Sequence, residues 1–103
     1  MDPVVIERLI EQGRDGYEAR LAAGQARLKA GELTIAVEHL RRATAFDPDR
    51  TMAWQALGQA MNDSGDSAAA RQAWEQGVEV ARSNGDQQAE KVMMVWLRRL
   101  DRQ

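Results

Sequence analysis

Few residues of this chain could do chemistry, and none stands in a pattern that catalysis requires. The single histidine, His39, lies among charged neighbours, with Glu38 before it and two arginines shortly after it. Such surroundings indicate a solvent-facing side chain rather than a general base. Asp63 and Asp66 enclose a Ser-Gly pair that could suggest a calcium loop. The later bidentate glutamate of such a loop does not follow at the right spacing, so a turn between two helices is the better interpretation.

The motifs of the common enzyme classes are missing. The sequence contains no HExxH, GxGxxG, GKS/GKT or GxSxG pattern. It also has no cysteine, which excludes a disulfide framework, a thiol nucleophile and a zinc-thiolate site. We therefore expect no catalytic residues, no metal and no cofactor, and the chain is not expected to be an enzyme.

The strongest pattern is a repeat at an offset of 34 residues. A repeat of this length that cannot bury its apolar face alone must stack on copies of itself. The recurring residues are Ala19, Ala22, Gly24, Gln25, Ala26, Gly31 and Ala36, which return as Ala53, Ala56, Gly58, Gln59, Ala60, Gly65 and Ala70.

Two pairs of repeated glycines predict different features. Gly24 and Gly58 fall inside alanine-rich helical stretches, where glycine costs about 1 kcal/mol relative to alanine. A neighbouring helix that approaches closely is the best reason for them. Gly31 and Gly65 stand where one helical pattern stops and the next begins, which predicts a helix C-cap that leads into a tight turn.

At these residues the chain resembles the tetratricopeptide repeat (TPR) family, whose motif is W-x2-L-G-x2-Y, then A-x3-F, then P. The second copy matches it with Trp54, Leu57, Gly58, Met61, Ala70 and Trp74, and has Arg82 in place of the proline. The first copy keeps Gly24, Ala36, Leu40, Ala43 and Pro48, but has Arg20, Ala23 and Arg27 where the family prefers large apolar residues. The resemblance also places Trp54 and Trp74 facing each other across the interior of one hairpin.

The resemblance implies an all-α fold, a TPR-like right-handed solenoid of antiparallel helix hairpins with six helices. The expected helices run from Asp2-Pro3 to near Gly13, over 16–30 and 33–46, over 51–63 and 66–82, and over 86–101. We expect a single domain, 1–103, with an N-terminal capping helix in 1–16, repeats in 17–50 and 51–84, and a C-terminal capping helix in 85–103.

In TPR proteins the first helices of successive repeats line a concave groove that binds a peptide. The resemblance implies that ten residues face it here, although a solvated helix face is the competing interpretation. They are Glu18, Leu21, Gln25, Leu28, Lys29, Met52, Gln55, Gln59, Asn62 and Asp63. A clamp for a C-terminal carboxylate is not expected, because Leu21 and Ala56 occupy positions that would need basic or amide side chains.

The last helix offers an alternative contact surface. Its apolar run from Val92 to Leu97 wraps the whole circumference, whereas a cap needs only one buried stripe. Packing of one stripe on the preceding hairpin would use Ala89, Val92 or Met93, Trp96 and Leu100. The alternative is a homodimer or partner contact through Met94 and Leu97.

Composition and charge narrow the function further. A net charge of −2 provides no electrostatic footprint for nucleic acid or an anionic membrane. Secretory and transmembrane signals are missing, so a cytoplasmic protein is expected. The predicted function is a non-catalytic protein–protein interaction module, an adaptor, scaffold or co-chaperone-like protein that binds a protein or peptide segment. The alternative is a self-associating assembly domain that dimerises through its C-terminal helix.

Overall fold

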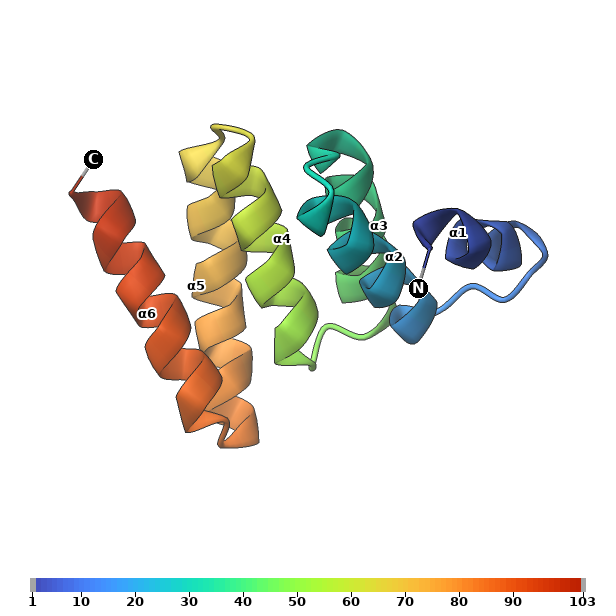
Figure 1. Ribbon diagram of the computed structural model, residues 1–103. Helices are drawn as coiled ribbons and strands as arrows, with labels where there is room; N and C mark the ends of the chain where they lie inside the picture. Colours follow the sequence, from blue (N-terminus) through green and yellow to red (C-terminus); the bar gives the residue numbers. More distant parts are fainter. Residues whose placement is uncertain (1, 103) are drawn as a thin grey trace.

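The computed structural model describes residues 2–102, and every regular element within them is an α-helix. The helices are α1 (Pro3–Glu11), α2 (Tyr17–Lys29), α3 (Leu33–Phe46), α4 (Thr51–Asp63), α5 (Ser67–Asn84) and α6 (Gln87–Asp101). Figure 1 shows them in sequence order, from α1 at one end of the molecule to α6 at the other. Helices α2 and α3 pack as one hairpin and α4 and α5 as a second, while α1 packs on α2 and α6 packs on α5. The prediction of an all-α helical repeat is confirmed.

Local signals in the sequence account for the ends of the helices. Asp2 caps α1, where its carboxylate accepts a hydrogen bond from the Val4 amide at 2.9 Å. Asp66 and Asp86 cap α5 and α6 in the same way. Gly31 adopts a φ of 77° and Gly65 one of 87°, a left-handed conformation that closes the turn inside each hairpin. Helix α5 extends to Asn84, two residues beyond the expected end.

The repeated glycines inside helices lie at close helix crossings, as predicted. A Cβ atom built on Gly58 would lie 2.2 Å from Nε1 of Trp74, and one on Gly24 would lie 2.6 Å from Cδ2 of Leu40. Gly77 is a third such crossing, which the sequence analysis did not find. There a Cβ atom would lie 2.5 Å from Sδ of Met93, so Gly77 allows α6 to pack closely on α5.

The two tryptophans of the second repeat occupy different environments. Trp74 is 2% exposed, and its ring centroid lies 5.1 Å from that of Trp96 on α6. Trp54 is only half-buried, and its indole donates a hydrogen bond to the Pro48 carbonyl at 2.9 Å. The prediction that Trp54 faces Trp74 is therefore corrected, because the aromatic partner of Trp74 is Trp96.

A network of polar side chains attaches α1 to the first hairpin. Glu7 accepts hydrogen bonds from two nitrogens of Arg27, one of them Nε at 2.9 Å, and its Oε2 lies 2.7 Å from Nε2 of His39. Nδ1 of His39 lies 3.1 Å from an Arg20 nitrogen, and Arg20 also pairs with Asp15 at 2.7 Å. Arginine can only donate, so Nδ1 of His39 accepts and Nε2 carries the proton that is donated to Glu7.

This network corrects the sequence analysis at His39. The side chain was expected to face solvent, but the residue is 8% exposed. Its charged neighbours in the sequence are exposed, whereas the His39 side chain faces Glu7 on α1 and Arg20 on α2. The network also explains why Arg20 and Arg27 replace the apolar residues of the family motif, since both guanidinium groups hold carboxylates next to α1.

Acid should loosen this attachment. The hydrogen bonds from Arg27 hold the pKa of Glu7 at about 2, below its ordinary 4.5. The stabilisation from this lowered pKa is fully present above the unfolded value of 4.5 and disappears as pH falls towards 2. Urea unfolding at a series of pH values should show that the wild type loses more stability over this range than Glu7→Gln does.

A second variant serves as the control, because other carboxylates titrate over the same pH range. Glu11 lies on the same helix and is exposed, so Glu11→Gln should keep the wild-type pH profile. Parallel pH profiles for the wild type and Glu7→Gln would show that Glu7 does not couple folding to pH.

Candidate protein-binding site

A hollow of about 220 Å³ lies across α2, α4 and α6. We call it the first-helix hollow, because α2 and α4 are the first helices of their repeats and α6 follows them at the same offset. Its lining residues are Gln25, Leu28, Met52, Gln55, Ala56, Gln59 and Trp96. Gln25, Leu28, Met52, Gln55 and Gln59 are among the residues that the resemblance assigned to the groove, so the fold brings half of that set together.

The lining combines apolar surface with amide groups and carries no charged side chain. Leu28, Met52 and Trp96 supply the apolar part, and 51% of Met52 is exposed. The three glutamines each carry two N–H donors and one acceptor oxygen. The Gln59 amide nitrogen donates to Asp63 at 2.8 Å, which orients this group. Such a surface can accommodate an apolar side chain and hydrogen-bond a peptide backbone.

The other residues of the predicted set do not line this hollow. Leu21 is 9% exposed and belongs to the core. Glu18 pairs at 2.5 Å with Arg50, which precedes α4. Lys29 lines an adjoining hollow beside α1, which shares Gln25 with the first-helix hollow. Asn62 is half-buried, and Asp63 contributes through its hydrogen bond to Gln59.

Two lining residues, Ala56 and Trp96, were not in the predicted set, and Trp96 is the larger of them. The apolar run on the last helix assigned it to packing, and it does contact Trp74. The 34-residue offset could have predicted that Trp96 also lines the hollow. Trp96 stands 34 residues after Asn62, and Asn62 stands 34 after Leu28. One side chain therefore covers the core and closes the hollow at its α6 end.

The apolar run on α6 is only partly covered, because Met94 and Val95 are each 38% exposed. Ala89, Met93 and Leu100 are buried, as the packed stripe required. Leu97 is half-buried and packs against the core, whereas 38% of Met94 is exposed. Self-association through Met94 and Leu97 stays a prediction, with Met94 as its accessible member.

Residues 2–102 contain neither a membrane-spanning helix nor a cluster of metal ligands. No helix there combines the length and the apolar content needed to cross a membrane. No group of three or more histidine and acidic side chains lies close enough together, in the same part of the chain, to hold a metal ion.

Comparison with known proteins agrees with the repeat. A family model described as tetratricopeptide repeat matches residues 17–60. A TPR repeat-containing protein of Pseudomonas aeruginosa is 45% identical over 97 residues, which cover 94% of this chain and 92% of that protein. The solution structure of a Bordetella parapertussis protein has a TM-score of 0.84 and 40% identity, and the match covers 99% of this chain and 89% of that one.

The chain therefore belongs to the tetratricopeptide repeat family. Repeats of this family generally mediate protein–protein interactions and are generally non-catalytic.

Proposed function

We propose that this protein is a cytoplasmic adaptor that binds an extended segment of a partner protein in the first-helix hollow. The observation that carries the proposal is the convergence of three glutamine amides on one uncharged, partly apolar surface contributed by three helices. Because no charge lines the hollow, the matching segment is uncharged there and carries at least one apolar side chain.

The size of the hollow supports a peptide rather than a metabolite as ligand. Small-molecule sites measure roughly 300 to 1,000 Å³, whereas this hollow has about 220 Å³. It accommodates one or two side chains of a segment whose backbone continues over α2 and α4. Gln25 and Gln55, on neighbouring helices, could then hydrogen-bond successive peptide groups.

Two glutamate substitutions at equally exposed apolar residues test the proposal. Met52 lines the hollow, and Phe46, at the end of α3, lies outside its lining; each is 51% exposed. Met52→Glu should weaken partner binding by more than about tenfold, because the partner would bury an unpaired carboxylate. Phe46→Glu adds the same charge and should leave binding unchanged.

Cross-linked capture from the source organism, quantified by mass spectrometry, can compare both variants with the wild type. Candidate partners are the proteins that Met52→Glu loses and Phe46→Glu retains, and titration with the purified candidate then gives the loss of affinity. The proposal fails if both variants retain the same proteins or if both lose them.

A further inference from the structure

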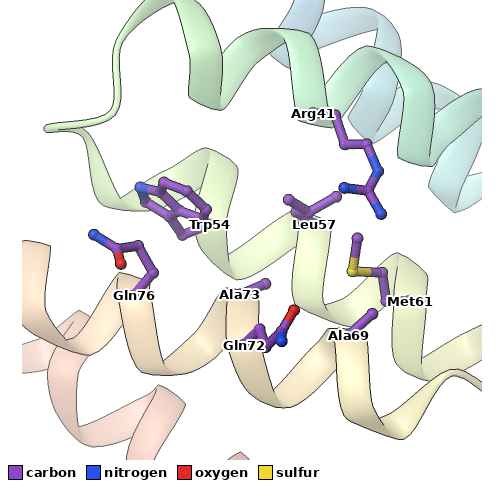
Figure 2. A pocket seen from close by; sticks show the side chains of 8 residues that line it. All are labelled: Arg41, Trp54, Leu57, Met61, Ala69, Gln72, Ala73 and Gln76. Atoms are coloured by element: carbon purple, nitrogen blue, oxygen red, sulfur yellow. The ribbon is translucent and has the colours of Figure 1, made fainter.

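A second hollow, also of about 220 Å³, lies on the opposite face of α4, between α3 and α5. We call it the second-helix hollow. Figure 2 shows its lining: Arg41, Trp54, Leu57, Met61, Ala69, Gln72, Ala73 and Gln76. Successive residues of an α-helix are turned by about 100°, so Trp54, Leu57 and Met61 point away from the side on which Met52, Gln55 and Gln59 line the first-helix hollow. The two hollows can therefore be occupied independently.

The floor of this hollow is apolar and fixed in place. Leu57, Met61 and Ala73 are each at most 5% exposed and belong to the core. The half-buried Trp54 forms one wall, and its indole is held by the hydrogen bond to Pro48. An apolar side chain could enter without rearrangement of the protein.

Arg41 provides an unpaired cation above this apolar floor. In Figure 2 its side chain extends from α3 towards Leu57 and Met61. Arg20, Arg27 and Arg50 each pair with a carboxylate, but within residues 2–102 the guanidinium of Arg41 takes part in no hydrogen bond or ion pair. An adjoining hollow contains both Arg41 and Asp66, yet the Asp66 carboxylate caps α5 instead.

The α1 network occupies the position in the first repeat that the second-helix hollow occupies in the second. Comparison of the two indicates which charge a ligand of the hollow should carry. Four lining residues stand 34 positions after members of the α1 network: Arg41 after Glu7, Trp54 after Arg20, Met61 after Arg27 and Ala73 after His39. In the first repeat the chain fills this place itself, with the Glu7 carboxylate against Arg27 and His39. In the second repeat, α3 takes the place that α1 has in the first, and it contributes Arg41 where α1 contributes the Glu7 carboxylate. The residues around Arg41 are mostly apolar. The chain therefore leaves the matching carboxylate to come from outside.

We propose that the second-helix hollow binds a partner segment in which an aspartate or glutamate adjoins a large apolar side chain. The apolar group enters against Trp54, Leu57 and Met61, and the carboxylate pairs with Arg41. Gln72 and Gln76 lie at the rim, where their amides can hydrogen-bond the backbone of the segment. This surface is separate from the first-helix hollow, so the protein would connect two partner segments.

Nuclear magnetic resonance with a short capped peptide tests the proposal. The peptide contains one phenylalanine followed by one glutamate between serine and glycine residues. Its addition should shift the indole N–H resonance of Trp54 saturably and leave that of Trp96 in place. Replacement of the peptide glutamate by glutamine should weaken binding about fivefold, the effect expected for a partly exposed charge pair. Arg41→Gln should weaken binding of the original peptide by the same factor.

A charge reversal and a matched control make the test specific for the guanidinium. Arg41→Glu should bind a lysine-containing version of the peptide better than the glutamate version. Arg98→Gln removes another exposed cation, on α6, and should leave the affinity unchanged. Three results would overturn the proposal: equal binding of the glutamate and glutamine peptides by the wild type, shifts at Trp96 in place of Trp54, or no saturable shift at millimolar peptide.

Discussion

Trp74→Ala should cost about 3 to 5 kcal/mol of folding free energy, the usual range for truncation of a buried aromatic side chain. Trp74 is 2% exposed, lies under Gly58, and contacts Trp96 on the last helix. Its truncation would leave a cavity between three helices. It would also remove the indole donor that bonds the Gln55 carbonyl at 3.2 Å. The total free energy of unfolding of a small domain is roughly 5 to 15 kcal/mol. Thermal melts followed by circular dichroism should therefore show a large fall in the midpoint temperature.

Trp54→Ala is the matched comparison for this prediction. Trp54 is a tryptophan of the same hairpin, but it is half-buried. Its truncation should therefore cost clearly less folding free energy than truncation of Trp74. Fluorescence of single-tryptophan variants offers an independent check, with emission from Trp74 at shorter wavelength than emission from Trp54. The assignment of the core fails if Trp54→Ala is the more damaging substitution or if Trp74 emits as a solvated indole.

The repeat made the helices and their turns predictable because each signal is local. A glycine that needs a positive φ, such as Gly65, and a carboxylate cap, such as Asp66, act within a few residues of themselves. The crossing at Gly58 was also predictable, since glycine is unfavourable inside a helix unless a neighbour requires the space. Gly77 was missed because the repeat offers no second glycine for comparison, as Ala43 stands at its offset.

The α1 network could not be predicted from any single stretch of sequence. Glu7 and His39 are 32 residues apart, and Glu7 and Arg27 are 20 apart. Taken singly, Arg20 and Arg27 are departures from the family motif and His39 is a polar residue among charges. Their hydrogen-bond network with Glu7 forms only when α1, α2 and α3 pack together.

The candidate site was predictable in part, for a related reason. The resemblance to the family assigned Gln25, Gln55 and Gln59 to one groove, and spacing along a helix predicts that Gln55 and Gln59 share a face of α4. Spacing does not tell how much of that face a neighbouring helix covers. Leu21 lies on the same face of α2 as Gln25 but is covered by the core, whereas Trp96 extends from a helix whose motif residues are absent.

Gly58→Leu should destabilise the protein by about 3 kcal/mol or more, at the upper end of the usual cost of overpacking. Even the first added carbon would lie 2.2 Å from Nε1 of Trp74. That indole cannot move aside easily, since it is almost fully buried and lies against Trp96. Higher helix propensity would return only about 1 kcal/mol, so α4 and α5 would have to separate.

Chemical denaturation of three variants measures how much the close packing at Gly58 contributes to the free energy of unfolding. Gly58→Ala adds only the first carbon and should also lower the free energy of unfolding, although alanine favours the helix. Ala22→Leu introduces leucine at an exposed position of α2 and should change stability little. Unchanged or increased stability of Gly58→Leu would mean that α4 does not approach Trp74 as closely as the distance of 2.2 Å implies. A loss ordered Gly58→Leu, then Gly58→Ala, then Ala22→Leu would instead identify the contact with Trp74 as the reason for glycine at this position.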